Sequence, residues 1–235
     1  MSEPIQLSLG ISLNDEATFT NYHVVGDKNR IVVDALQNFA ERRGDKNLVI
    51  WGGRGSGLTH LLQACARQIH LNHQAMQYLP LRDLVGYSPN QVCEGLENLS
   101  FVCLDGIDEI CGNAGWEQAI FHLYNRLKEN DQRLLIASHT SPPALPIVLA
   151  DLKSRILGST VYHVEGLSHN GKSAALQARA QNRGMELSDE VTQFILNRAP
   201  RDMNELFTLL NRLDDASLQE QRKLTIPFVK KVLCL

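Results

Sequence analysis

The stretch WGGRGSGLTH, residues 51–60, decides the fold of this chain. Phosphate-binding loops have the pattern Gly, four residues, Gly, Lys and then Ser or Thr, placed between a strand and a helix. Gly52, Gly57 and Thr59 fit this pattern, whereas Leu58 stands where the lysine is expected. An apolar segment, NLVIWG, leads into the stretch, and a segment of helical character follows it. The sequence therefore predicts a strand, a phosphate loop and a helix, without the usual loop cation.

Strands and helices alternate through the first two thirds of the chain. The predicted strands are NLVIWG, AMQYLPL, SFVCLDG, RLLIAS and TVYHV, and the predicted helices cover residues 28–43, residues 58–70 and WEQAIFHLYNRLKEN. Gly44 is expected to end the first helix. The alternation predicts an α/β fold with a mostly parallel sheet that is covered by helices on both faces. Ligands of such sheets bind beyond the carboxyl ends of the strands, where Gly52, Asp105 and Ser138 fall.

Only helical segments follow in the last third of the chain. The four expected helices span residues 168–183, 188–198, 202–217 and 226–235. Ser188 is expected to cap the second of them, and Pro227 to lie in the first turn of the last. We therefore expect a tail at residues 1–20, an α/β nucleotide-binding domain at residues 21–164 and a small all-helical domain at residues 165–235.

Composition argues against several classes of protein. Lys and Arg total 23 and Asp and Glu total 26, a net charge of −3, whereas a dedicated nucleic-acid binder carries a basic surplus. No apolar run is long enough to span a membrane and the N-terminus has no signal pattern, so we expect a cytoplasmic protein. The five cysteines have no zinc-binding spacing and are expected to be buried thiols.

The loop is expected to bind phosphate without its lysine. The backbone N–H groups of the loop and the start of the next helix supply a positive field that does not depend on that side chain. The Thr59 hydroxyl can reach Mg²⁺, but the lysine contact to the γ-phosphate is lost, so we expect a bound nucleoside diphosphate, ADP first, with Mg²⁺. A substitute cation at Arg54, and a glycine-rich turn that binds nothing, are the alternatives. The expected binding residues are Gly53, Arg54, Gly55, Ser56, Gly57, Leu58 and Thr59.

A second nucleotide motif is FVCLDGIDEI. An apolar strand that ends in aspartate is the usual partner of a phosphate loop, and Asp105 would help Thr59 to hold Mg²⁺. Active ATPases of this kind commonly have an acid next, where this chain has Gly106; Asp108 and Glu109 are too far along the chain for the same geometry. Both motifs therefore lack the residue that contributes most directly to hydrolysis, the lysine at position 58 and the acid at position 106. This indicates a protein that binds nucleotide as a structural or switching ligand.

Longer segments of the chain resemble a known family. The segments FTNYHVVGDKNRIVVDAL, LDGIDEI, WEQAIFHLYNRL, LLIASHTSPPAL and DLKSRI resemble the bacterial replication initiator DnaA in order and spacing. A chain of this length that carries QLSLGI near its start, without a counterpart of the helix-turn-helix domain of DnaA, is similar to the Hda family of DnaA-homologous regulators. The resemblance implies an AAA+ fold, a phosphate-loop sheet followed by a helical lid.

The resemblance also implies partners. Members of the Hda family bind the DNA-loaded sliding clamp (beta) of DNA polymerase III and stimulate ATP hydrolysis on DnaA, which prevents re-initiation of replication. A short apolar peptide in a polar tail suits recognition by a pocket on the clamp. Gly10 stands where the family usually has proline, and packing of the tail on its own domain is the alternative. The residues that match the clamp-binding motif are Gln6, Leu7, Leu9 and Ile11.

Further roles are carried over from the family by position. Arg155 in DLKSRI matches the arginine finger, which reaches the nucleotide of a neighbouring subunit and stabilises charge on the transferring phosphate. The base-contacting segment is matched by Val24, Val25 and Gly26. Ser138 and His139 stand at the first sensor position, where the family typically has an acid in place of His139. The second sensor falls at Arg201 or Asn204.

The leading hypothesis is a nucleotide-bound AAA+ adaptor, tethered to the clamp, that acts on DnaA and has no intrinsic ATPase of consequence. The first alternative is an AAA+ ATPase of helicase-loader type, which the missing lysine and the missing second acid disfavour. The second alternative is a DNA-binding architectural protein, which the acidic charge balance disfavours. We expect no sequence-specific DNA binding and no membrane partner, and the sequence leaves self-association open.

Overall fold

The computed structural model describes residues 16–24, 26–199 and 203–233, and the side chain of Asn204 is outside the description. These residues form two compact units. The first consists of the described residues up to Tyr22 together with Gly26–Gly53 and Leu58–Val164. The second consists of His23, Val24, Arg54–Gly57 and the described residues from Glu165 onward.

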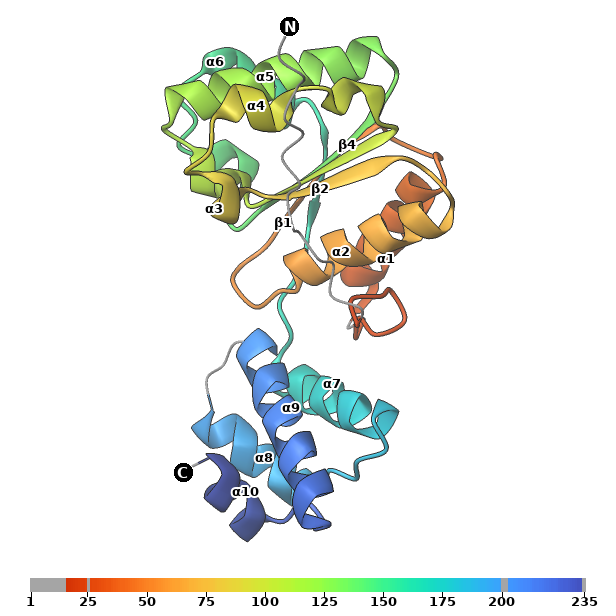
Figure 1. The fold of residues 1–235 in the computed structure, drawn as a ribbon, viewed down its shortest axis with the longest axis vertical. Coiled ribbons are helices and arrows are strands. Elements are labelled where there is room, and N and C mark those ends of the chain that lie inside the picture. The colour runs from red at the N-terminus through yellow and green to blue at the C-terminus, as the bar shows by residue number, and fades with distance from the viewer. Residues whose placement is uncertain (1–15, 25, 200–202, 234–235) are drawn as a thin grey trace, which may run out of the picture. The chain divides into compact units, whose positions relative to one another are not determined.

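A five-stranded parallel sheet is the centre of the first unit (Figure 1). The strand order is β2-β3-β4-β1-β5, and every pairing is parallel. Strands β1, β3 and β4 are nearly continuous apolar runs because helices cover both of their faces. The predicted α/β sheet is confirmed. The strands are β1 (Asn47–Trp51), β2 (Met76–Pro80), β3 (Phe101–Asp105), β4 (Arg133–Ser138) and β5 (Thr160–His163).

Helices lie on both faces of the sheet, as predicted. One face is covered by α1 (Gly26–Ala40) and α2 (Leu58–Leu71), and the other by α5 (Ala114–Glu129) with α4 (Pro89–Cys93) and α6 (Ala150–Leu157) (Figure 1). The main core under α5 includes Trp116, Ile120, Leu123 and Leu127, which share one face of that helix. The short elements are α3 (Leu81–Leu84), η1 (Leu96–Asn98), η2 (Ile107–Ile110) and η3 (Pro142–Ala144).

Helix α1 ends earlier than the sequence pattern predicts. The prediction ran to Arg43 with Gly44 as the stop, whereas the helix ends at Ala40. Arg42 adopts a left-handed φ of 60°, and the N–H of Arg43 donates to the carbonyl of Asn38 at 2.8 Å. This bond closes the last turn in the manner of a Schellman cap, here with a non-glycine residue in the left-handed position.

The second unit contains a four-helix arrangement with its own core. The helices are α7 (His169–Asn182), α8 (Asp189–Arg198), α9 (Met203–Glu220) and α10 (Ile226–Leu233). The Ser188 hydroxyl accepts a hydrogen bond from the N–H of Val191, which confirms the predicted cap. Leu206, Leu210 and Leu213 of α9 are buried in this core. The predicted helical lid is therefore confirmed, with each helix within a few residues of its predicted bounds.

Candidate functional site

The three residues singled out at strand ends lie at one edge of the sheet. Strands β3, β4 and β1 are consecutive neighbours, and Asp105 and Ser138 are the last residues of β3 and β4. The N–H of Gly52, directly after β1, donates to the Ser138 carbonyl at 3.1 Å, and that of Gly106 to the Ala137 carbonyl at 3.1 Å. The carboxyl ends of the strands thus meet as the parallel sheet requires.

Asp105 has a partner that the sequence did not indicate. The Tyr78 hydroxyl donates to Oδ2 of Asp105 at 2.6 Å, and Gln63 Nε2 donates to that hydroxyl at 3.4 Å. Burial, and then the negative charge of Asp105, raise the pKa of Tyr78, so the phenol stays protonated and remains a donor. Tyr78 therefore holds one carboxylate oxygen of Asp105 in place, and no described residue donates a hydrogen bond to the other oxygen.

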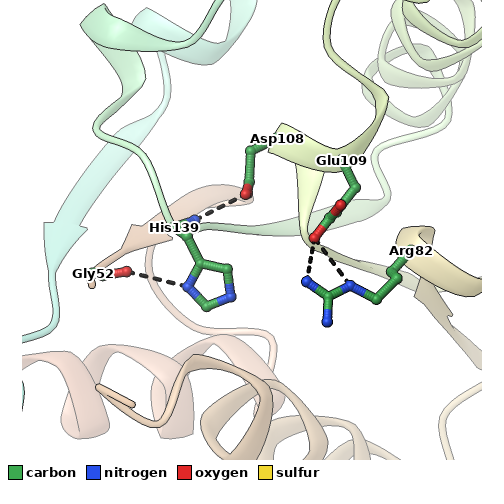
Figure 2. Close-up of polar contacts among 5 residues, drawn as sticks. All are labelled: Gly52, Arg82, Asp108, Glu109 and His139. Carbon is green, nitrogen blue, oxygen red and sulfur yellow. Dashed lines mark hydrogen bonds and ion pairs between the residues drawn. The ribbon is translucent and has the colours of Figure 1, made fainter. Parts of the chain in front are cut away.

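The two later acids of FVCLDGIDEI are both occupied (Figure 2). Asp108 Oδ1 accepts the backbone N–H of His139 at 2.9 Å. Glu109 Oε1 accepts Nη2 of Arg82 at 2.6 Å and Nε of the same side chain at 3.1 Å. Gly106, where active enzymes have an acid, has a left-handed φ of 82°. Both acids therefore hold other groups of the protein in place, Asp108 the main chain at His139 and Glu109 the side chain of Arg82.

His139 connects the end of β4 to the start of the phosphate loop. Its Nδ1 lies 3.4 Å from the Gly52 carbonyl, while its backbone N–H is held by Asp108 (Figure 2). The neighbouring Ser138 hydroxyl donates to the Thr140 carbonyl at 2.8 Å. The residues at the first sensor position are therefore engaged with main-chain groups beside Gly52.

The loop residues divide between the two units. In the first unit Gly53 and Thr59 are exposed, and Leu58 opens α2 with only 2% of its side chain exposed. The residue in the lysine position is therefore part of the core, and its side chain does not face solvent. In the second unit Gly55 and Gly57 have φ values of 77° and 89°, a conformation that residues with a Cβ rarely adopt.

Residues 16–22 pack on the helix that begins at the loop. His60 Nε2 lies 2.8 Å from the Thr18 carbonyl, and the rings of His60 and Tyr22 are 5.7 Å apart. Asn21 donates its N–H to the Thr18 hydroxyl at 3.1 Å, which closes the turn. Burial lowers the pKa of His60, against an opposing effect of the Thr18 carbonyl, and burial raises the pKa of Tyr22 to about 12. Neutral side chains therefore hold this segment to α2.

Arg155 lies in the last turn of α6. Its guanidinium carbon is 5.9 Å from the centre of the Tyr124 ring of α5, and the residue is partly exposed. Within the part of the chain that the structure describes, no carboxylate lies within 4.0 Å of the guanidinium. The helix itself was not predicted, and it is anchored by the buried Leu152 and Ile156. Arg155 is thus a supported cation without an anionic partner among the described residues.

Several expected site residues lie elsewhere or outside the description. Val24 is half-buried in the second unit, Gly26 opens α1 with a φ of 76°, and Arg54 is exposed. The expected clamp-binding residues of the tail, one residue of the base-contacting segment and one candidate for the second sensor lie outside the described residues. The backbone of Asn204, the other candidate for the second sensor, lies in α9. Those outside the description are Gln6, Leu7, Leu9, Ile11, Val25 and Arg201.

The four cysteines among the described residues are free thiols, and three of them are buried. Cys65, Cys93 and Cys103 are buried and Cys111 is half-buried, while Cys234 is outside the described residues. Burial raises the pKa of Cys93 to about 11 and that of Cys103 to about 12, so both stay protonated near neutral pH. Among the described residues there is no cluster of three or more His, Cys, Asp and Glu that would hold a metal, and none of their helices is long and apolar enough to cross a membrane.

The fold and this edge of the sheet define an AAA+ protein: a parallel sheet with a glycine-rich loop after β1, an aspartate at the end of β3 and a helical unit after β5. A family model of the bacterial DnaA ATPase domain matches residues 13–163, and a model of the Hda lid domain matches residues 169–233. The chain therefore belongs to the bacterial DnaA family of AAA+ proteins, and its helical part is of the Hda type. Membership of this family supports a role in the regulation of replication initiation.

Individual proteins are also similar to this chain, in sequence or in fold. The chain is 42% identical over 231 residues to an uncharacterized protein from Haemophilus influenzae, covering 98% of this chain and 99% of that protein. Domain III of the replication initiation protein DnaA from Thermotoga maritima has the same fold, with a TM-score of 0.80, 22% identity and coverage of 95% and 98% of the two chains. AMPPCP-bound DnaA from Aquifex aeolicus gives a TM-score of 0.72 at 21% identity, covering 89% of this chain and 71% of that one.

Proposed function

We propose that this protein is a nucleotide-bound AAA+ adaptor that binds the DNA-loaded sliding clamp and stimulates ATP hydrolysis on DnaA. The observation that carries the proposal is the contrast between two parts of the first unit. Leu58 is buried and Asp108 and Glu109 are held by the protein itself, which disfavours hydrolysis by this chain. Arg155 is a cation with no carboxylate near it among the described residues, which favours action on a second molecule.

The nucleotide in this proposal is ADP with Mg²⁺. The backbone N–H groups of residues 53–59 would surround the diphosphate, because glycine at positions 55 and 57 permits the backbone geometry of such loops. The cation would lie between the Thr59 hydroxyl and the Asp105 oxygen that Tyr78 leaves free, and it would neutralise phosphate charge. Two DnaA structures of the same fold are described as bound to AMPPCP, which supports nucleotide binding by a protein of this fold.

Intrinsic hydrolysis is disfavoured by the positions of the acids. A water-activating carboxylate has to lie within hydrogen-bond reach of the attacking water. Glu109 is paired with the Arg82 guanidinium, and Asp108 accepts the N–H that fixes His139. A side chain already occupied in this way is a poor general base. A helicase-loader type of ATPase is the competing function, and appreciable ATP turnover by the isolated chain would favour it.

Arg155 would supply the charge that completes the site on DnaA. A guanidinium is always charged and presents donors in a planar fork that matches phosphate oxygens. Arg155→Ala is expected to leave nucleotide and clamp binding unchanged and to remove most of the stimulation, since arginine fingers contribute on the order of 10³–10⁵ in rate in GTPases. Arg155→Lys should also fail, because it keeps the charge without the fork.

The test is phosphate release from ATP-bound DnaA with loaded clamp, in the presence of each variant. Arg198→Ala is a matched control, because Arg198 also packs over an aromatic ring, that of Phe194 at 4.5 Å, but belongs to the second unit. Full stimulation by Arg155→Ala would exclude this arginine as the finger.

The tail would tether the protein to the clamp through Gln6, Leu7, Leu9 and Ile11. Short-peptide recognition draws most of its affinity from a few anchor side chains. Deleting residues 1–12, or changing Gln6 and Leu7 to alanine, is expected to abolish co-elution with the clamp and to leave the thermal unfolding of the protein unchanged. Clamp binding by the truncated protein would contradict this part of the proposal.

A further inference from the structure

The carboxylate of Glu117 is a buried charge that joins two distant segments of the first unit. Glu117 lies in the first turn of α5 with 1% of its surface exposed. Its Oε1 accepts the N–H of Gly112 at 2.7 Å, and its Oε2 accepts that of Leu149 at 2.7 Å. The N–H of Val148 lies 3.0 Å from Oε2 and 3.2 Å from Oε1. One side chain thus ties the start of α5 to the two residues that precede α6.

The chemistry of this contact requires a carboxylate. A buried charge is strongly unfavourable unless hydrogen bonds satisfy it, and here three main-chain amides do so. The N-terminal end of α5 adds a favourable field, because the first turn of a helix stabilises an anion. A carboxamide of the same shape has only one acceptor oxygen, so its NH₂ group would face an amide donor on one of the two sides.

Helix α5 also contacts α6 at a second point. Tyr124 is two turns further along α5 than Glu117, on the same face, and its ring lies 5.9 Å from the Arg155 guanidinium. Glu117 therefore fixes the beginning of α6, and Tyr124 supports the residue in its last turn. With Leu152 and Ile156 packed in the core between these points, α6 has little freedom to slide along α5.

We propose that Glu117 is the positioning residue for Arg155. It holds the main chain at Val148 and Leu149, directly before α6, and through this helix it sets where the guanidinium of Arg155 lies. Glu117 acts through α6 and is not itself in contact with a reacting group. The inference rests on the proposed role of Arg155, but the tie between Glu117 and α6 is a property of the isolated protein. Its existence is therefore measurable without any partner.

The first measurement compares the full chain with Glu117→Gln. Hydrogen exchange at the Val148 and Leu149 amides is expected to become about tenfold faster or more, because a carboxamide is neutral and has one acceptor oxygen, so the charge-assisted hydrogen bonds to these amides are weakened or lost. The NMR resonances of the Arg155 side chain, which lies 5.9 Å from the centre of the Tyr124 ring, are expected to move. Glu97→Gln is the matched control: it removes a carboxylate that pairs with Arg126 of α5 at 3.2 Å, and it should change neither readout.

The second measurement is stimulation of ATP hydrolysis on DnaA. Glu117→Gln is expected to lower the maximal stimulation by about 10- to 100-fold, because a displacement of about 1 Å in a reacting geometry has effects of this size. The double variant with Arg155→Ala should be no worse than Arg155→Ala alone. If Glu117→Gln does not fold, Glu117→Asp keeps the charge with a shorter reach and is expected to give a partial loss.

The results of these measurements distinguish a failure of the positioning role of Glu117 from a failure of the proposed finger role of Arg155. Unchanged exchange at Val148 and Leu149, unmoved Arg155 resonances, full stimulation by Glu117→Gln, or a double variant that loses activity multiplicatively would each overturn the positioning role. Full stimulation by Arg155→Ala would instead overturn the finger. In that case, the exchange rates and the Arg155 resonances still decide whether Glu117 sets the place of this side chain.

Discussion

Leu58 is the residue that separates this chain from an ordinary phosphate-loop enzyme. In the proposed site the loop would bind phosphates through backbone groups, Thr59 and Mg²⁺, and a γ-phosphate would gain no contact from a lysine at position 58. We expect ADP and ATP to bind with similar affinity when titrated into the full chain in a calorimeter. A preference for ATP greater than about tenfold, or roughly 1.4 kcal/mol, would contradict this account of Leu58.

The burial of Leu58 leads to a second prediction, about stability. Its side chain is 2% exposed, so Leu58→Lys would place an ammonium group in the core. An uncompensated buried charge typically costs about 3–5 kcal/mol, so we expect a loss of this order in the free energy of unfolding measured by urea titration. Leu58→Met has similar volume and no charge, and its cost should stay below about 1.5 kcal/mol. Equal stability of the two variants would show that the lysine reaches solvent.

At the scale of elements, residues 16–22 are held to α2 by the neutral ring of His60. Burial lowers the pKa of His60 below its ordinary 6.5, so the unfolded chain takes up this proton at a higher pH than the folded protein does. The contribution of His60 to stability is therefore complete above about pH 6.5 and is lost as the pH falls below it.

We expect the amides of residues 18–22 to lose protection against hydrogen exchange between pH 6.5 and pH 5, a change in addition to the fall in the intrinsic exchange rate over this range. His60→Gln should lack this extra change, because a carboxamide can donate to the Thr18 carbonyl but does not titrate. An NMR titration midpoint for His60 at or above 6.5 would refute the expectation.

The sequence predicted the elements that have a clear periodicity and missed those that do not. All five strands and the long helices followed from apolar runs and helical spacing, because their burial is regular. The four-residue α3 and the five-residue α4 are too short for such a signal, and tertiary packing stabilises them. The eight-residue α6 was also missed, although α10, of the same length, was predicted.

In the candidate site too, some features could be predicted from the sequence and others could not. Gly52, Asp105 and Ser138 were placed together because parallel strands end at one edge. Contacts across 27 to 31 residues, such as Tyr78 with Asp105 and Asp108 with His139, depend on register and loop paths that no local pattern specifies. Glu117 was read only as part of an amphipathic helix.

For the whole molecule, the two units have separate hydrophobic cores. The core of the second unit includes Leu176, Ile195, Leu206, Leu213 and Val229, each of them nearly or fully buried. Domains of this size can fold alone when the core is well packed. We expect residues 165–235, made as a separate fragment, to be helical and to unfold cooperatively on heating, as followed by circular dichroism.

Leu213→Asp in this fragment is the control, because it places a carboxylate where the native side chain is fully buried. It should remove the cooperative transition. A gradual, non-cooperative loss of helical signal in the unaltered fragment would mean that the second unit depends on the first for its stability.

The pairing of β1 with β5 places a tryptophan, and with it a source of intrinsic fluorescence, directly before the phosphate loop. The chain has two tryptophans, and Trp51, the last residue of β1, stacks on His163 of β5 with ring centres 4.1 Å apart. Trp116 is 1% exposed in the core and is shielded from solutes. Because Trp51 directly precedes Gly52, its intrinsic fluorescence is expected to change when a nucleotide binds the loop as proposed. Nucleotide arrival could thus be followed in unlabelled protein, with Trp51→Phe as the blank.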